Sequence, residues 1–227
     1  RIGLAYQATE PYVHAPWMHG FDGALLQDDG IDLHRPGAVE ALAFAHGLLK
    51  SGLVPEEPTG ALVTQLFNDG MAAMVINGPW FLGEVDPTIP VRVVPLPTVS
   101  ATGKPASPYL TVEAIQVSAH STQKAEARAF ASWLVSTDPA IERAIKGRQT
   151  VATLSAHEDP RIAEDPILSA FQRQMEQSHP MATDPALAAS WEPLARGIRR
   201  VMRDAATPDE ALAAAQTEFE IVTRPPP

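Results

Sequence analysis

The sequence predicts an α/β fold, in which a parallel β-sheet is layered with α-helices. Short apolar segments alternate with longer segments whose apolar residues recur with helical spacing. Strands that alternate with helices in this way usually pair in parallel through helical crossovers. Several helical patterns begin at a proline, which suits the first position of a helix because the N–H that proline lacks has no partner there.

The expected elements follow one another along the whole chain. Residues 1–6 form an apolar segment that indicates a strand already in progress, so we expect the chain to be part of a longer polypeptide. Further extended segments are predicted at residues 71–76, 91–94 and 109–117. Helices are predicted at residues 36–50, 61–67, 124–135, 138–146, 160–177, 185–203 and 208–219. Residues 55–60, 95–108 and 155–159 are predicted to be loops, and residues 224–227 a disordered tail.

The most informative segment, residues 67–80, encodes a helix end, a strand and the start of another helix. Its sequence is FNDGMAAMVINGPW. Gly70 suits a helix C-terminus, because glycine adopts a positive φ without a steric clash. Residues 71–76 are a continuous apolar run, which predicts a strand buried on both faces. An Asn-Gly turn follows, and Pro79 then places Trp80 in the first turn of a helix at the carboxyl end of the strand, where open α/β sheets bind ligands.

The composition excludes several classes of function. The chain has 227 residues, of which 45% are hydrophobic, and a chain of this size buries about 70% of its surface on folding. The formal net charge of -10 argues against nucleic acid and anionic membrane surfaces as partners. The absence of cysteine removes thiol catalysis, disulfides and thiolate metal sites. No apolar run approaches the roughly 18 residues of a membrane span, and no signal peptide is recognisable in this chain.

Residues 67–80 resemble a motif of a known family. They match F-N-x-G-x-x-A-M-x-I-N-G-P-W, the signature of maltose-binding-protein-like extracellular solute-binding proteins, which deliver sugars to ABC transporters. Glu-Pro-Tyr at residues 10–12, followed by Gly-Phe-Asp-Gly at residues 20–23, resembles a second segment of that family. A third is Ala-Ser-Trp at residues 189–191, with its tryptophan eighteen residues before the Asp-Glu-Ala-Leu that opens the last helix. The order and spacing of these segments agree, so the resemblance covers essentially the whole chain.

The resemblance implies a type II periplasmic-binding-protein-like fold with two lobes. It implies that residues 1–110 and 160–227 form the C-terminal lobe and that residues 111–159 belong to the N-terminal lobe. The rest of the N-terminal lobe precedes the Glu-Pro-Tyr segment in the family and is not in this chain. We therefore expect a fragment or a separately encoded half of a receptor, whose crossing segment finds its packing partners on a companion chain or by swapping between copies.

The resemblance also implies a set of sugar-binding residues. Trp80 and Trp191 offer flat rings on which the C–H patches of a pyranose stack. A tryptophan is more often buried in a core, so position and resemblance, rather than residue type, favour this role. The Glu10 carboxylate is expected to accept hydrogen bonds from sugar hydroxyls, Pro11 to stiffen the loop, and Tyr12 to offer a ring and a phenol. The simpler interpretation of these three residues is a polar turn after a strand.

Two positions depart from the family pattern. Glu192 stands where the best-known members carry an aromatic residue, and Ala195 stands where they carry an arginine, although Arg196 is adjacent. These changes affect the identity of the sugar rather than the stacking platform, and Glu192 is included among the ligand-binding candidates. Trp17 does not align with a family aromatic and is expected to lie in the core or at the lip of the site.

Other chemistries have little support in the sequence. The seven histidines, at positions 14, 19, 34, 46, 120, 157 and 179, lack the spacing or clustering of a metal site. The acidic residues 28–32 lack the pattern of a calcium loop, and phosphate-binding loops and G-x-S-x-G are absent. Glu10 and Asp22 could form a glycosidase pair, but nothing in the sequence places them across a bond. We therefore expect no catalytic residue, no metal and no cofactor.

The expected function is non-enzymatic binding of a maltose/maltodextrin-like or related oligosaccharide, as a component of an ABC transporter. The expected partners are the oligosaccharide, the missing N-terminal lobe and the membrane subunits of the transporter, and the expected location is the periplasm or the outer cell surface. Two alternatives stay open: a protein-interaction module built on half of a binding-protein fold, and a carbohydrate-active enzyme that uses Glu10. Alone, the chain is expected to bind sugar weakly or not at all.

Overall fold

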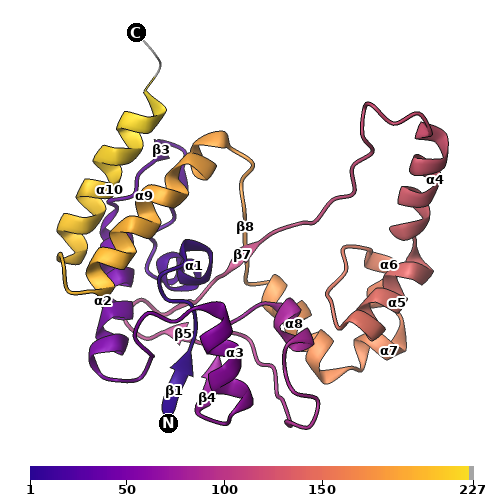
Figure 1. Cartoon of the computed structure of the whole chain (residues 1–227), viewed down its shortest axis with the longest axis horizontal. Helices are drawn as coiled ribbons and strands as arrows, with labels where there is room; N and C mark the ends of the chain where they lie inside the picture. Colours follow the sequence, from indigo (N-terminus) through magenta and orange to yellow (C-terminus); the bar gives the residue numbers. More distant parts are fainter. Residues whose placement is uncertain (225–227) are drawn as a thin grey trace. The chain divides into compact units, whose positions relative to one another are not determined.

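The computed structural model of the chain describes residues 1–224 (Figure 1). The terminal prolines that were predicted to form a disordered tail lie outside the described residues. The chain divides into two compact units. Unit 1 contains Arg1–Asn77, Leu96–Leu110 and the residues from Gln177 onward, and unit 2 contains Gly78–Pro95 and Thr111–Glu176. The polypeptide therefore passes between the units four times.

The described part of unit 1, up to residue 224, contains four pairs of short strands and five helices. β1 (Ile2–Ala5) and β4 (Ala72–Val75) are parallel, with Ile2 opposite Ala72. β7 (Tyr109–Leu110) and β8 (His179–Pro180) are also parallel. The two antiparallel pairs are β2 (Leu26–Gln27) with β3 (Gly30–Ile31), and β5 (Thr98–Val99) with β6 (Lys104–Pro105). The helices are α1 (Pro11–Gly20), α2 (Pro36–Lys50), α3 (Gly60–Asn68), α9 (Pro185–Met202) and α10 (Pro208–Thr223).

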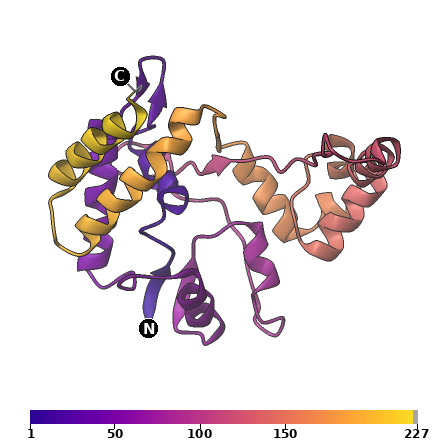
Figure 2. The same cartoon turned by 45° about the horizontal axis from the view of Figure 1, so that its top comes forward.

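The core of unit 1 lies between α1, α2, α9 and α10. α9 and α10 lie side by side in both views (Figures 1 and 2), and both contact α2. Gly197 permits this close approach, because a Cβ at that position would lie 3.2 Å from the carbonyl oxygen of Ala211 on α10. Leu42, Ile198 and Leu212 are among the fully buried side chains that fill the space between these helices.

Local sequence signals explain where these helices begin. Proline occupies the first position of α1, α2, α9 and α10. The Asp184 side chain caps α9 by accepting a hydrogen bond from the backbone N–H of Ala186, at 2.8 Å. Thr207 and Glu210 form a capping box at the start of α10, in which each side chain accepts from the backbone N–H of the other residue.

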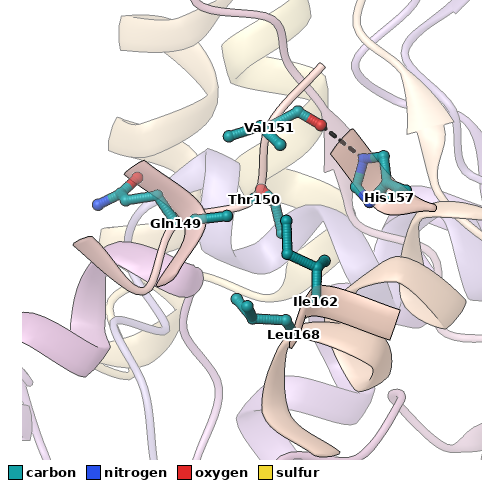
Figure 3. A pocket seen from close by; sticks show the side chains of 7 residues that line it. Gln149, Thr150, Val151, His157, Ile162 and Leu168 are labelled. Atoms are coloured by element: carbon teal, nitrogen blue, oxygen red, sulfur yellow. Dashed lines mark hydrogen bonds between the residues drawn. The ribbon is translucent and has the colours of Figure 1, made fainter. Parts of the chain in front are cut away.

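Unit 2 contains a short 3₁₀ helix, η1 (Pro79–Gly83), and five α-helices. These are α4 (Lys124–Leu134), α5 (Thr137–Gly147), α6 (Leu154–His157), α7 (Pro160–Ala163) and α8 (Pro166–Met175). A small core of Ala140, Ile141, Ala144, Val151, Ala156, Ile162 and Leu168 holds the last four helices together, and Figure 3 shows Val151, Ile162 and Leu168 of this core. None of the helices within residues 1–224 is long and apolar enough to cross a membrane.

The helices predicted at residues 36–50, 61–67, 124–135, 138–146, 185–203 and 208–219 are confirmed within a few residues at each end. The helix predicted at residues 160–177 is instead two helices. α7 ends at Ala163, and Asp165 caps α8 by accepting hydrogen bonds from the N–H groups of Ile167 and Leu168, so that Pro166 begins a new helix. The loop predicted at residues 155–159 is also wrong, because α6 occupies most of it.

The strand predictions are less accurate than the helix predictions. No strand forms at residues 91–94, and of the extended segment at 109–117 only Tyr109–Leu110 pairs with another strand. β4 forms as predicted but is not buried on both faces, since Ala73 is exposed and the Met74 side chain is 59% exposed. Among the described residues β4 pairs only with β1, so the sheet is too narrow to cover it.

Candidate functional site

The Glu-Pro-Tyr segment lies at the start of α1 rather than in a loop. Pro11 is the first residue of the helix and is buried, so the prediction that it stiffens a loop is corrected. Glu10 is the N-cap, with φ -93° and ψ 119°, and its backbone carbonyl accepts from the N–H of His14 at 2.9 Å. The Glu10 side chain makes no capping hydrogen bond and Glu10 is exposed. The helix start therefore fixes the backbone of Glu10, and its carboxylate is open to solvent.

Tyr12 and Trp191 come from distant parts of the sequence and contact the same ring. Tyr12, in the first turn of α1, stacks on Tyr109 with the ring centroids 6.1 Å apart and the planes at 28°. Trp191, on α9, meets Tyr109 edge to face, with the centroids 6.0 Å apart and the planes at 63°. Both Tyr12 and Trp191 are half-buried, whereas Tyr109 is only 7% exposed. The structure thus brings together two of the predicted sugar-binding residues, Tyr12 and Trp191, through a third aromatic ring.

Two histidines complete what we call the aromatic cluster, which consists of Tyr12, His19, Tyr109, His179 and Trp191. The His19 ring meets Tyr109 edge to face at 4.7 Å and stacks on His179 at 4.4 Å. His19 Nδ1 lies 2.6 Å from the backbone carbonyl oxygen of Ser107, so Nδ1 carries the proton and donates to that oxygen.

Burial dominates the electrostatics of the cluster. It lowers the pKa of His19 to about 4, an effect that the Ser107 hydrogen bond opposes and the neighbouring His179 reinforces. His14, one turn before His19 on the same helix, is 1% exposed, and burial together with the nearby His19 lowers its pKa to about 4 as well. Burial also raises the pKa of the Tyr109 hydroxyl to about 12. At neutral pH His14 and His19 are therefore uncharged, and so is Tyr109.

No sequence pattern singled out Tyr109, His19 or His179. The histidines were predicted to lack the clustering of a metal site, which does not exclude the ring stack of His19 and His179, 160 positions apart in sequence. No local motif marks any of the three, so only the long-range pairing of β7 with β8 could have revealed them. The described residues contain no group of three or more potential metal ligands.

Glu192 lies next to Trp191 but is engaged with arginines. Its Oε1 accepts from Arg199 at 3.1 Å and from Arg196 at 3.3 Å, and its side chain is 64% exposed. Arg196 also pairs with Glu218 of α10, at 2.7 Å. Ala195 is buried, at 6% exposure. A hydroxyl-bearing ligand at Trp191 would therefore meet a carboxylate whose orientation is already set by two arginines.

Trp80 belongs to unit 2, whereas all five residues of the aromatic cluster belong to unit 1. It follows Pro79 in η1, a short 3₁₀ helix where the sequence predicted the first turn of a helix, and it is 46% exposed. Its ring folds back over Gly78, where an added Cβ would lie 2.1 Å from the ring carbon Cζ3. Gly78 therefore allows the ring to adopt this position.

Two further candidates have structural roles. Trp17 is 5% exposed, and its ring packs edge to face on Tyr6 and Phe44, which confirms that it belongs to the core. Asp22 forms an ion pair with Lys104.

The sequence of this chain matches the model of a known protein family over most of its length. A family model described as bacterial extracellular solute-binding protein matches residues 3–170. The chain belongs to this family. Its resemblance to the maltose-binding-protein-like members, predicted from residues 67–80, is confirmed.

Curated relatives in this family are binding proteins. The chain is 29% identical over 212 residues to the maltotriose-binding protein of Pyrococcus abyssi (strain GE5 / Orsay), an alignment that covers 90% of the chain and 46% of the relative. It is 28% identical over 196 residues to the galactooligosaccharide-binding protein of Bacillus subtilis (strain 168), covering 84% of the chain and 46% of the relative. The chain thus spans about half the length of the curated relatives it matches.

Solved structures agree on the fold. The maltose/maltodextrin-binding domain MalE from Bdellovibrio bacteriovorus bound to maltotriose superposes with a TM-score of 0.88 at 26% identity, covering 99% of this chain and 61% of that one. A cyclo/maltodextrin-binding protein complexed with maltotetraose gives 0.82 at 25% identity, covering 98% and 59%. The maltose-maltodextrin binding protein of Alicyclobacillus acidocaldarius gives 0.89 at 22% identity, covering 96% and 62%, and supports the fold alone. The predicted α/β, type II periplasmic-binding-protein-like fold is confirmed, with helices dominant.

Proposed function

We propose that the chain forms part of an oligosaccharide receptor and binds a malto-oligosaccharide or a related sugar. The observation that carries this proposal is the aromatic cluster, in which half-buried Tyr12 and Trp191 from two separate helices contact one buried ring. Their rings suit the apolar C–H faces of a pyranose. Glu10 lies two residues before Tyr12 and Glu192 directly follows Trp191. Their exposed carboxylates suit the sugar hydroxyls, because a carboxylate accepts at both oxygens.

The names of relatives and structural neighbours favour the same class of ligand. Proteins named for maltotriose, galactooligosaccharide and maltodextrin binding are among them. These are names of binding proteins, so we propose a non-enzymatic role for this chain, with delivery of the sugar to the membrane subunits of an ABC transporter. The corresponding location is the periplasm or the outer cell surface.

Exposed apolar surface supports a partner for this chain. On α4 the rings of Phe130 and Trp133 stack on each other at 5.8 Å and are 60% and 57% exposed. Met74 on β4 is similarly exposed, and a sheet of only two strands is rarely stable without further strands or helices on it. We propose that residues 111–159 belong to the N-terminal lobe and that further polypeptide of that lobe covers these surfaces. The predicted C-terminal lobe of residues 1–110 and 160–227 needs a different second boundary, because Ile162 and Leu168 share one core with Ala140 and Ala156. We therefore propose that residues 160–176 go with residues 111–159. We also propose that Trp80, which is 46% exposed, offers a ring for stacking on sugar.

Isothermal titration calorimetry with maltotriose tests the proposal. The chain is titrated alone and after mixing with the polypeptide that supplies the rest of the N-terminal lobe. We expect weak or no binding alone and measurable binding by the mixture. Trp191→Ala and Tyr12→Ala should each weaken binding about 2- to 10-fold, since stacked aromatic contacts contribute roughly 0.5–1.5 kcal/mol.

Phe44→Ala is the matched control, because Phe44 is a partly exposed aromatic whose ring contacts are with Trp17 and Phe21 of the core. Equal losses in the control and in Trp191→Ala would contradict a stacking role. Tight binding by the lone chain would contradict the need for a partner lobe. Chromatography of the sugar after incubation should recover it unchanged, and hydrolysis abolished by Glu10→Gln would favour a carbohydrate-active enzyme instead.

A further inference from the structure

Tyr109 occupies the centre of the aromatic cluster. Its ring is 7% exposed and contacts Tyr12 of α1, Trp191 of α9 and His19 of α1, with His179 of β8 at 6.3 Å. Tyr109 contacts both Tyr12 and Trp191 and so joins these two side chains. No motif in the sequence predicted a role for Tyr109.

The backbone around Tyr109 is fixed on two sides. His179 donates its N–H to the Pro108 carbonyl at 2.8 Å, and Met181 donates to the Leu110 carbonyl at 3.0 Å, which pairs β7 with β8 in parallel. Ser107 accepts a hydrogen bond from the His19 imidazole at its carbonyl and donates its own hydroxyl to the Gln177 carbonyl at 2.5 Å. The Tyr109 ring therefore projects from a short segment that is attached to both α1 and β8.

We propose that Tyr109 is a positioning residue that sets the separation and angle of Tyr12 and Trp191, and thereby the shape of the sugar-stacking surface. This inference rests on the proposed function. Stacked and edge-to-face rings prefer particular offsets, so a buried ring between two others restricts both of them. Pre-setting the two rings lowers the ordering cost of binding, because a free side chain loses rotamer freedom when a ligand fixes it.

Two substitutions distinguish the contribution of the Tyr109 ring to binding from that of its hydroxyl. Tyr109→Phe keeps the ring and should bind maltotriose within about twofold of the wild type. Tyr109→Leu removes the ring and should weaken binding about tenfold, since each of the two ring contacts changes an equilibrium by about 2- to 10-fold. Phe219→Leu is the matched control, because Phe219 is also 7% exposed in the core of unit 1 but, among the described residues, its ring does not stack on any ring of the cluster. It should lose stability and keep its affinity.

A double substitution tests whether Tyr109 acts through Trp191. In the Trp191→Ala background, Tyr109→Leu should weaken binding only about threefold, because only the contact with Tyr12 remains to be lost. The titrations use the chain mixed with the rest of the N-terminal lobe, as described above. A full tenfold effect in both backgrounds would show that Tyr109 does not act through Trp191 and would overturn the inference.

A second measurement needs no ligand. In the full chain labelled with 5-fluorotryptophan, the ¹⁹F resonance of Trp191 is assigned by its loss in Trp191→Phe. It should shift in Tyr109→Leu and stay near its wild-type position in Tyr109→Phe and Phe219→Leu. An unmoved resonance in Tyr109→Leu, or equal losses of affinity in Tyr109→Leu and Phe219→Leu, would overturn the inference. If the wild type binds no maltotriose, the proposed function fails, while the ¹⁹F comparison still decides whether Tyr109 positions Trp191.

Discussion

The buried histidines of α1 should make unit 1 less stable in mild acid. Burial lowers the pKa of His14 from 6.5 to about 4, with a smaller contribution from the nearby His19, whose own pKa falls to about 4. In the unfolded chain each imidazole takes up a proton as the pH falls through 6.5, whereas in the folded chain it does so only near pH 4. The unfolded state therefore binds more protons between these values, and stability falls as the pH falls.

The size of the effect follows from the two pKa values. At pH 7.5 both states of His14 are mostly neutral and the histidine contributes almost nothing to the pH dependence. At pH 5 the unfolded imidazole is largely protonated and the folded one is largely neutral, which costs about 2 kcal/mol of stability for each histidine. The two together should cost about 4 kcal/mol between pH 7.5 and pH 5, a large fraction of the stability of an ordinary domain.

Urea unfolding at both pH values measures this cost. His14→Leu removes one buried imidazole, whose Nδ1 has no hydrogen-bond partner among the described residues. It should reduce the difference in unfolding free energy between pH 7.5 and pH 5 by about 2 kcal/mol. His120→Gln, which changes an exposed histidine, should leave the difference unaltered. The reasoning would be refuted if His14→Leu kept the full wild-type difference, or if NMR titration placed the folded His14 pKa near 6.5.

Three further substitutions test local features of the fold. Gly78→Ala should displace the Trp80 ring, because the new Cβ would lie 2.1 Å from it; a changed Trp80 signal in the ¹⁹F spectrum checks this, and an unchanged one would contradict the packing. Gly197→Ala should cost about 1 kcal/mol in urea unfolding despite alanine's higher helix propensity, because its Cβ would approach the Ala211 carbonyl at 3.2 Å; a gain in stability would contradict the close approach of α9 and α10. Thr207→Ala should cost about 1 kcal/mol by removing the capping box of α10, whereas Thr207→Ser should restore most of it, and equal losses in both would rule out the cap.

Much of the helical structure could be predicted because its signals are local. A proline at the first position and an apolar period of 3.6 located α2, α9 and α10. The apolar helical period was misleading at residues 160–177. There it continues past Asp165-Pro166, although these two residues start a new helix and so separate α7 from α8.

The strands were harder to predict because their pairing depends on distant segments. The apolar run at residues 71–76 reads as a strand in the middle of a sheet, but in the described residues β4 has a single neighbour and Met74 remains exposed. The valines at residues 91–94 have high β propensity but do not pair with another strand, so propensity alone does not produce a strand there.

The candidate site was predictable only in part, for the same reason. Tyr12 and Trp191 could be selected because each lies in a recognisable motif. Tyr109 lies at the end of a Pro- and Ser-rich segment, and its place between them depends on β7 pairing with a strand about 70 residues away. The roles of Glu10, Pro11, Tyr12, Trp80, Trp191 and Glu192 in binding sugar stay predictions.

Unit 1 is built from three separate segments of the chain, so its core cannot close until late in synthesis on the ribosome. The core around Leu42 is closed by Leu194, Ile198 and Leu212, which are translated after the whole of unit 2. Residues 111–176 alone take roughly 3 to 13 seconds to translate at typical rates of about 5–20 residues per second. During that interval the apolar faces of α1 and α2 have no α9 or α10 to cover them. A nascent chain stalled before residue 177 should therefore bind chaperones and be cleaved readily within residues 1–77, whereas release of the full chain should protect the same residues.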